Sequence, residues 1–343
     1  MSSWEQVPKE YYTRLGNSGL KISRIIVGCM SFGDKSWSDW IIDDKKQVFE
    51  ILKKAYDEGI RTFDTADVYS SGASEQLLGD FLKEYKIKRD KVVILSKVFY
   101  PCDLADASKE PRDYINSQGL SRKHIFDAAK ASVERLGTYM DVLQIHRFDP
   151  QTPIEETMEA LHDVVKEGYT RYIGASSMKT YQFAMLQATA EKYGWTKFIS
   201  MQNYYNVIHR EEEREMIEYC KLTNVGLIPW SPNARGVLTR PLSQKIGTTN
   251  RVNSDGRVKY LVLDSMTDAD KEIINRVEEL SKKYNVAMAT ISTAWVLSKG
   301  CSPIVGFSKP ERIDDAIAAL KLKLSDKDLK YLEEPYAPKE NAW

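Results

Sequence analysis

Short runs rich in valine, isoleucine and leucine alternate along the chain with longer stretches whose apolar residues recur every three to four positions. The short runs predict buried β-strands and the longer stretches predict amphipathic helices. Eight strands are expected, at residues 22–28, 62–65, 92–96, 142–146, 172–175, 198–202, 226–229 and 303–305. Helices are expected near residues 43–57, 75–85, 121–136, 153–167, 180–192, 212–223 and 287–297, with others beginning at Thr267 and Ser308 and a last one over 326–333.

This alternation favours a closed (β/α)8 barrel, the TIM-barrel fold of the α/β class, over an open doubly wound sheet. We expect a single domain over residues 1–343, with an N-terminal segment (1–21) and a C-terminal tail (334–343) outside the barrel repeats. The alternative is a Rossmann-like domain followed by a second domain, which would carry a G-x-G-x-x-G motif after its first strand. Residues 28–33 read GCMSFG, which does not match that motif.

Two connections are longer than the usual ~2–6 residues of such units, namely residues 99–120 and 231–265. Both would lie at the C-terminal mouth of the barrel, where barrel enzymes build their active sites. The alternative interpretation is that these segments only decorate the surface.

The composition excludes several classes of protein. The chain carries 49 Lys+Arg against 49 Asp+Glu, so it has no broad electrostatic attraction to nucleic acids or acidic membranes. The four cysteines are far apart and form no CxxC pair, which is typical of reduced thiols in an intracellular protein. The first residues lack the apolar core of a signal peptide, and no run is long enough to span a membrane. We therefore expect a cytoplasmic protein.

Four polar residues cluster at the ends of consecutive predicted strands. Asp64, Lys97 and His146 end the second, third and fourth strands, and Tyr69 follows Asp64 by five residues. In a barrel these strand ends face one mouth. A free phenol, with a pKa of about 10, is a poor acid at neutral pH, and a neighbouring cation stabilises its anion. Each residue alone is more often structural, but together they favour a phenol that protonates an alkoxide while hydride reaches carbon.

The motifs around these residues resemble the aldo-keto reductase superfamily over nearly the whole chain. They are FDTADVY (63–69), Ser96-Lys97, QIH (144–146), LGTYMDV (136–142), IGASS (173–177), MQNYYN (201–206) and WSP (230–232). HRFD (146–149) followed by TPIEET (152–157), together with EEEREM (211–216) and RGVLTR (235–240), resembles the fungal aryl-alcohol dehydrogenase-like branch.

The resemblance implies a function and a set of site residues. Tyr69 would be the general acid of a tetrad with Asp64, Lys97 and His146. The cofactor would be NADPH in preference to NADH, and its binding residues would be Gly28, Met30, Asp64, Ser176, Ser177, Gln202, Trp230, Ser231, Arg235, Gly236, Leu238, Ser308, Lys309 and Arg312. Trp37 and Trp40 would either wall the substrate pocket or pack on the barrel rim.

Within this set the implied roles differ. Ser176 and Gln202 match residues that bond the nicotinamide carboxamide, and Trp230 matches the aromatic residue that stacks under that ring; core packing is its alternative. Residues 231–238 match the segment that folds over the pyrophosphate, and residues 308–312 match the site of the 2′-phosphate. Gly306 stands where many members have lysine, and Asp315-Ala316 stands where they have a Glu-Asn pair, which weakens the expected selectivity for NADPH.

The predicted activity is reduction of aldehydes, aromatic ones in particular, and of some ketones, without a metal. The four histidines are scattered and no metal-binding motif is present. The acidic run 211–215 is expected to be a solvated helix start. One alternative is a cofactor-binding regulatory module resembling the potassium channel β subunit. Another is a barrel isomerase or aldolase, which the pairing of Lys97 with Asp64 disfavours because a Schiff-base lysine needs a free amine.

Overall fold

Eight parallel strands form one sheet in the computed structural model, which describes residues 8, 10–244, 261, 262, 264 and 266–340. The order of the strands across the sheet is β10-β3-β4-β5-β6-β7-β8-β9. Their bounds are β3 (Ile26–Gly28), β4 (Thr62–Asp64), β5 (Val93–Val98), β6 (Met140–Ile145), β7 (Thr170–Ser176), β8 (Phe198–Gln202), β9 (Gly226–Leu227) and β10 (Ile304–Gly306).

The first and last strands of this sheet are joined, so the sheet is closed. The Ser302 backbone N–H donates to the Leu227 carbonyl at 2.9 Å, and the Ile304 N–H donates to the Pro229 carbonyl at 2.9 Å. Trp230 also pairs with Ile304 in a parallel bridge. The predicted (β/α)8 barrel is confirmed.

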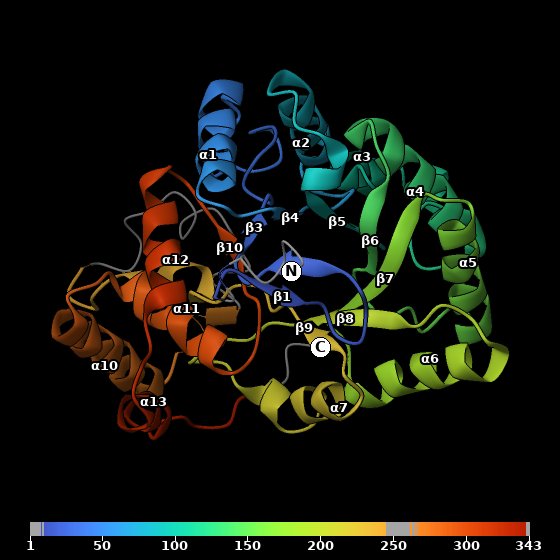
Figure 1. Ribbon diagram of the computed structural model, residues 1–343. Helices are drawn as coiled ribbons and strands as arrows, with labels where there is room; N and C mark the ends of the chain where they lie inside the picture. Colours follow the sequence, from blue (N-terminus) through green and yellow to red (C-terminus); the bar gives the residue numbers. More distant parts are fainter. Residues whose placement is uncertain (1–7, 9, 245–260, 263, 265, 341–343) are drawn as a thin grey trace, which may run out of the picture.

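Helices surround the strands (Figure 1). They are α1 (Lys45–Asp57), α2 (Ala73–Glu84), α3 (Leu104–Lys109), α4 (Arg122–Leu136), α5 (Ile154–Lys166), α6 (Thr180–Tyr193), α7 (Met216–Leu222), α10 (Asp268–Tyr284), α11 (Met288–Ser298), α12 (Glu311–Lys321) and α13 (Asp326–Glu333). The apolar faces of α1, α2, α4 and α5 pack on the strands in one continuous core. Each helix buries such a face because its apolar residues recur with the helical period. None of the described helices is long and apolar enough to cross a membrane.

A β-hairpin, β1 (Tyr12–Arg14) with β2 (Lys21–Ser23), covers the N-terminal end of the barrel (Figure 1). Its Leu15 and Ile22 lie in one buried cluster with residues that point into the barrel, such as Leu95 and Val142. At Gly16, which has φ +56°, a Cβ would lie 2.6 Å from the Ile199 carbonyl oxygen, so only glycine allows this close approach.

The expected first strand at 22–28 is therefore wrong as a single element. The Arg24 N–H donates to the Tyr11 carbonyl and extends the hairpin, whereas the Ile26 N–H donates to the Pro303 carbonyl in the barrel. The chain changes sheets between these two residues. The sequence hides this change because buried apolar residues lie on both sides of it, Ile22 before it and Ile26 and Val27 after it.

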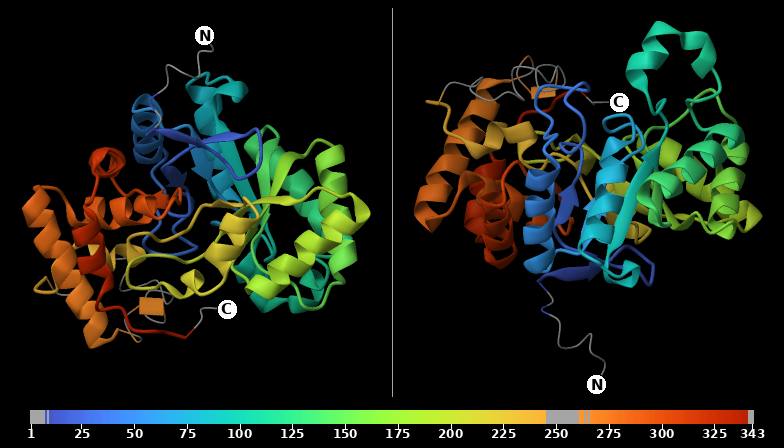
Figure 2. Two further views of the ribbon diagram at one scale, coloured as in Figure 1. Left: turned by 60° about the horizontal axis from the view of Figure 1, so that its bottom comes forward. Right: turned by 90° about the horizontal axis from the view of Figure 1, so that it is seen from above.

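The two long connections at the mouth contain short helical segments. Residues 99–120 contain α3 and a 3-10 turn (Pro111–Tyr114), and they rise beside the barrel rim in the right-hand view of Figure 2. Residues 231–244 begin with a 3-10 segment (Ala234–Thr239), and the remainder of the predicted loop at 245–260, 263 and 265 lies outside the described residues. The expected helix at 212–223 is a 3-10 turn (Glu211–Glu213) followed by the shorter α7.

Candidate active site

The four residues from the ends of the second to fourth predicted strands meet at the barrel mouth. The Lys97 ammonium donates to the Asp64 carboxylate at 2.5 Å, to the Thr65 carbonyl at 2.8 Å and to the Tyr69 hydroxyl at 3.1 Å. The rings of Tyr69 and His146 lie edge to face, with their centroids 6.0 Å apart. Strands β4, β5 and β6 are adjacent and parallel, and this adjacency is what brings the side chains together.

Lys97 is completely buried. Burial alone would lower the pKa of the Lys97 ammonium because desolvation disfavours the charged form. The Asp64 carboxylate and the Tyr69 oxygen outweigh burial, so the pKa of Lys97 is raised above its ordinary value. The lysine therefore stays protonated at neutral pH and directs a cation at the phenol oxygen.

Two buried amides hold the second oxygen of the Asp64 carboxylate. Gln144 and Gln202 donate to Asp64 Oδ2 at 3.0 and 2.9 Å, and Gln202 also donates to Gln144 Oε1 at 2.8 Å. Sequence reasoning did not assign Gln144 to the site. The signal was present, because Gln144 lies two residues before His146 on a strand and must share its inward face.

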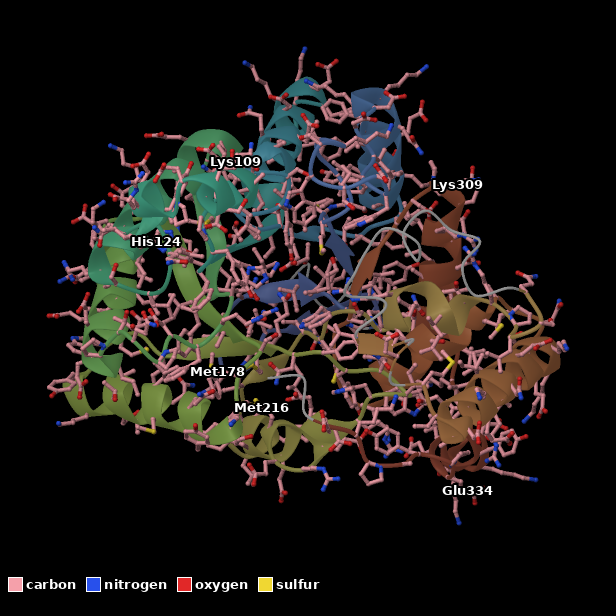
Figure 3. The ribbon with its side chains drawn as sticks, turned by 180° about the vertical axis from the view of Figure 1, so that it is seen from behind. Lys109, His124, Met178, Met216, Lys309 and Glu334 are labelled. Atoms are coloured by element: carbon pink, nitrogen blue, oxygen red, sulfur yellow. The ribbon has the colours of Figure 1, made fainter. Side chains whose placement is uncertain are left out.

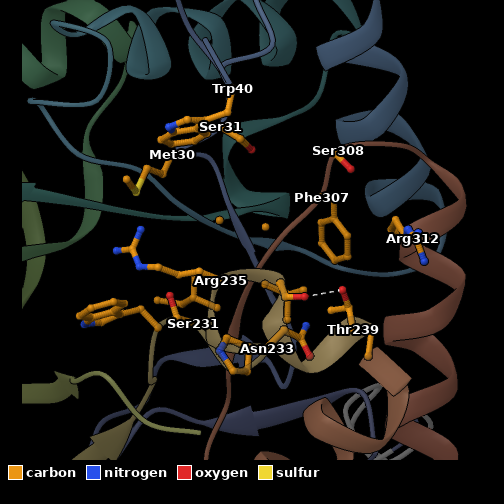
Figure 4. A pocket seen from close by; sticks show the side chains of 18 of the residues that line it. Met30, Ser31, Trp40, Ser231, Asn233, Arg235, Thr239, Phe307, Ser308 and Arg312 are labelled. Atoms are coloured by element: carbon orange, nitrogen blue, oxygen red, sulfur yellow. Dashed lines mark hydrogen bonds between the residues drawn. The ribbon is translucent and has the colours of Figure 1, made fainter. Parts of the chain in front are cut away.

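A cavity of about 920 Å³ opens beside the tetrad (Figure 4). Most of the expected cofactor residues line it, namely Gly28, Met30, Asp64, Ser176, Gln202, Trp230, Ser231, Arg235, Gly236, Ser308, Lys309 and Arg312, as do Tyr69, His146 and Trp40. In Figure 4, Met30 and Trp40 lie across the cavity from Ser231 and Arg235, and Ser308 and Arg312 lie at a third side.

Two expected contact residues lie outside the cavity wall. Leu238 is fully buried in a second apolar cluster with Ile273 and Val296 of α10 and α11. Ser177 is buried behind Trp230, whose indole Nε1–H donates to the Ser177 hydroxyl at 3.2 Å. These positions allow only indirect or backbone roles for Leu238 and Ser177.

Trp230 presents a flat surface to the cavity. Tyr204 stacks on its indole ring with centroids 4.6 Å apart and planes inclined by 27°. The Arg235 guanidinium lies over the same ring at 5.3 Å, and since Tyr204 already fills one face, we assign Arg235 to the other. The cavity-facing side of Trp230 thus accepts a planar cationic group, which core packing alone would not explain.

The cavity is rich in cations at its outer end. One of these cations, Arg235, lies in a segment with unusual backbone: residues 234–236 have φ of +44°, +56° and +99°. The Thr239 hydroxyl donates to the Gly236 carbonyl of this segment at 2.8 Å (Figure 4). Lys309 lies just before α12 at the molecular periphery (Figure 3), and Arg312 in its first turn is paired with Asp315 at 3.2 Å. Helix N-termini and arginines both favour a phosphate.

The inner end of the cavity is aromatic. The Trp37 ring packs 6.2 Å from Tyr69 and 5.9 Å from Trp40, between centroids. Tyr100 packs 5.3 Å from His146. Trp40 lines the cavity, whereas Trp37 supports Tyr69 from behind the wall. Tyr100 was not foreseen because the conformation of residues 99–120 is not readable from pattern.

The acidic run was misjudged at the sequence level. Glu211 and Glu212 are only 7% and 5% exposed, so they are not a solvated helix start. Glu211 bonds Arg214, Tyr336 and the Lys339 backbone, and Glu212 accepts from Asn203. Apart from Arg214, these partners lie nine or more residues away along the chain, which pattern reading cannot reveal.

Comparison with known proteins identifies the family. A model of the Aldo/keto reductase family matches residues 24–337. The chain belongs to this family. The predicted family is therefore confirmed, and with it the class of oxidoreductases that act on carbonyl groups and use a nicotinamide cofactor. The described residues of this aldo/keto reductase contain no group of three or more metal-ligating side chains.

Fungal relatives match this aldo/keto reductase over almost its full length. "Putative aryl-alcohol dehydrogenase AAD16" of Saccharomyces cerevisiae is 56% identical over 333 residues, which cover 95% of this chain and 96% of that protein. Versiconal hemiacetal acetate reductase of Aspergillus parasiticus is 50% identical over 337 residues, covering 96% and 97%. An aldo-keto reductase of Fusarium vanettenii is 48% identical over 345 residues, covering 96% and 91%. The fungal aryl-alcohol dehydrogenase-like resemblance is confirmed.

Proposed function

We propose that this protein is an NADPH-dependent reductase of aldehydes, aromatic ones in particular, and of some ketones, with Tyr69 as the general acid. The observation that carries this proposal is the Tyr69 phenol, held 3.1 Å from the buried Lys97 ammonium at the wall of the cavity. The names of the fungal relatives support carbonyl reduction.

The residues around the cavity fit a dinucleotide. The volume of the cavity lies near the top of the range of about 300–1,000 Å³ for ligand sites. Trp230 would take the nicotinamide ring, Ser176 and Gln202 its carboxamide, and Ser308, Lys309 and Arg312 the 2′-phosphate. The bound cofactor supplies a hydride. Because the ring would share a face of Trp230 with the Arg235 guanidinium, we expect Arg235 to turn toward the pyrophosphate.

The chain supplies the proton. Tyr69 would donate its hydroxyl proton to the alkoxide that develops on the substrate oxygen. Lys97 stabilises the phenolate left behind, and Asp64 keeps the lysine charged and in place. His146, next to Tyr69, would hold the substrate carbonyl oxygen within reach of the phenol. Since the charge develops close to a fixed buried cation, little reorganisation is needed during the reaction.

Aromatic aldehydes fit the inner end of the cavity best. Trp40 lines this end, and Tyr69 and His146 add flat faces around the reacting position, with Trp37 packed against Tyr69 and Trp40. Aromatic pairs gain about 0.5–1.5 kcal/mol beyond the area they bury, so an aryl ring gains more here than an aliphatic chain of equal size.

The test is oxidation of NADPH, followed optically, with matched aromatic and aliphatic aldehydes and with NADH in parallel. We expect kcat/KM to be higher for the aromatic members and for NADPH. An Arg312→Ala variant should lower the affinity for NADPH more than that for NADH, since it removes a 2′-phosphate contact. Tight binding of NADPH without turnover of any aldehyde would contradict the reductase and favour a cofactor-binding regulatory module.

A further inference from the structure

We propose that Glu212 is a positioning residue for the nicotinamide-stacking surface, acting on Trp230 through Asn203 and Ser177. The proposal rests on the function proposed above, which places the nicotinamide ring on Trp230. Glu212 itself does not line the cavity. Its position in the 3-10 turn before α7 gives no hint of a role in the site.

The first step is that Glu212 fixes the orientation of the Asn203 amide. Glu212 is 5% exposed and Asn203 is 4% exposed, and the Asn203 amide nitrogen donates to Glu212 Oε2. An ionised carboxylate accepts hydrogen bonds only, whereas an amide has one donating and one accepting end. The accepting end of Asn203 must therefore point away from Glu212.

The second step is that this accepting end holds Ser177. The Ser177 backbone N–H donates to Asn203 Oδ1 at 2.8 Å. Ser177 has φ +52°, a left-handed conformation that is uncommon and strained for a residue with a Cβ. Such a conformation persists only where neighbouring groups enforce it, and the hydrogen bond that Ser177 N–H donates to Asn203 does so here.

The third step is that Ser177 fixes the indole plane. Its hydroxyl accepts from Trp230 Nε1 at 3.2 Å. The Trp230 backbone N–H donates to the Asn203 carbonyl at 2.9 Å, so Asn203 anchors both the backbone and, through Ser177, the ring edge. Tyr204 supports one face of the indole at 4.6 Å. The edge and one face are thus defined, and the remaining face is the surface offered to the cavity.

The chain of contacts predicts a selective effect. If Glu212 is lost, the Asn203 amide can rotate, Ser177 loses the contact that enforces its backbone, and the indole is free to tilt. The 2′-phosphate end of the cavity, at Ser308 and Arg312, is built on a different element and is not touched by this chain of hydrogen bonds. Glu212 should therefore matter for the nicotinamide half of the cofactor and not for the adenosine half.

The experiment compares the binding of NADPH with that of 2′,5′-ADP, which lacks the nicotinamide, by isothermal titration calorimetry. For Glu212→Leu we expect roughly tenfold weaker binding of NADPH and unchanged binding of 2′,5′-ADP, since a buried hydrogen-bonded orientation is lost. Glu212→Gln keeps an accepting oxygen and should restore most of the difference. Glu211→Leu is the matched control, because the contacts of Glu211 run to Tyr336 and Lys339 in the C-terminal segment and not to Asn203, and it should not change the ratio of the two affinities.

Ser177→Ala is the second variant, needed if Glu212→Leu does not fold. It removes the acceptor for Trp230 Nε1 together with the hydroxyl that lies 3.2 Å from the Ser176 hydroxyl, and it should shift the ratio in the same direction. An unchanged ratio of affinities in both Glu212→Leu and Ser177→Ala, or in Ser177→Ala alone where Glu212→Leu does not fold, would overturn the proposal. Wild-type protein that binds NADPH no more tightly than 2′,5′-ADP would instead overturn the placement of the nicotinamide on Trp230, and with it the proposed function.

Discussion

At the scale of single residues, small changes in side-chain volume decide whether the buried network around Asp64 can exist. Gly174 on β7 is an example, because a Cβ there would lie 2.4 Å from the Ser200 hydroxyl and 3.1 Å from Gln144. The missing side chain leaves room for Gln144 to reach Asp64 inside the barrel. The geometry of the tetrad is therefore built from several strands at once.

The buried His209, which lies next to the Tyr204–Trp230 stack, makes the stability of the protein depend on pH. It is 4% exposed and packs on Tyr204, which also stacks on the Trp230 ring. Burial and, after it, the positive charge of Lys339 lower the pKa of His209 to about 4. The unfolded chain binds this proton near pH 6.5 and the folded chain only near pH 4, so stability is full above about pH 6.5 and is lost as the pH falls.

We predict that the free energy of unfolding drops by about 2 kcal/mol between pH 7 and pH 5 because of His209 alone. Urea unfolding at both pH values measures the change. His209→Phe keeps an aromatic ring against Tyr204 but cannot titrate, so its loss of stability over this range should be smaller by the same amount. An identical loss in the wild type and His209→Phe would contradict this account.

At the scale of elements, the loop that carries Tyr69 is held by a contact between helices. The three residues that follow Tyr69, namely Ser70, Ser71 and Gly72, have φ of +48°, +52° and +89°. Arg135 of α4 crosses over Gly72, where a Cβ would lie 2.6 Å from its Cδ. Arg135 also donates to the buried Glu75 of α2 at 2.7 Å, and Glu75 accepts from Ser96 on β5. The Arg135–Glu75 ion pair, with the hydrogen bond from Ser96, thus connects α2, α4 and β5 next to the tetrad.

We predict that Arg135→Leu lowers the free energy of unfolding by about 3–5 kcal/mol, because it leaves the Glu75 carboxylate buried without its cation. The double variant Arg135→Leu with Glu75→Gln should recover part of this loss. Equilibrium unfolding in urea measures both. A cost below about 1 kcal/mol for the single variant, the range of an exposed ion pair, would contradict this prediction.

The elements also show what the sequence can and cannot predict. Apolar alternation predicts every barrel strand, and the rule that parallel strand ends meet predicts that Asp64, Lys97 and His146 converge. The split of residues 22–28 between two sheets was missed, because buried apolar residues lie in both halves of the segment. The burial of Glu212 was missed because its partner, Asn203, follows β8 and lies outside the acidic run, and because charge alone indicates solvent.

At the scale of the whole molecule, the barrel separates stability from chemistry. The hairpin with Leu15 and Ile22 closes the N-terminal end with apolar side chains. The opposite end carries the cavity, with the cations Lys309 and Arg312 at its outer side and the tetrad within. This division lets the mouth hold buried charges such as Lys97 and strained residues such as Ser177, because the remaining barrel is a continuous packed core.

The central claim is that Tyr69 delivers the proton while the rest of the site binds. Tyr69→Phe removes only the hydroxyl and leaves the contacts of Lys97 with Asp64 and Thr65 in place. Single-turnover oxidation of NADPH with an aromatic aldehyde, measured beside the Kd for NADPH, tests this most directly. The account predicts a Kd within about twofold of wild type and a rate of hydride transfer lower by about 10²–10⁴. A rate above about a tenth of wild type would contradict the role of Tyr69 as the general acid.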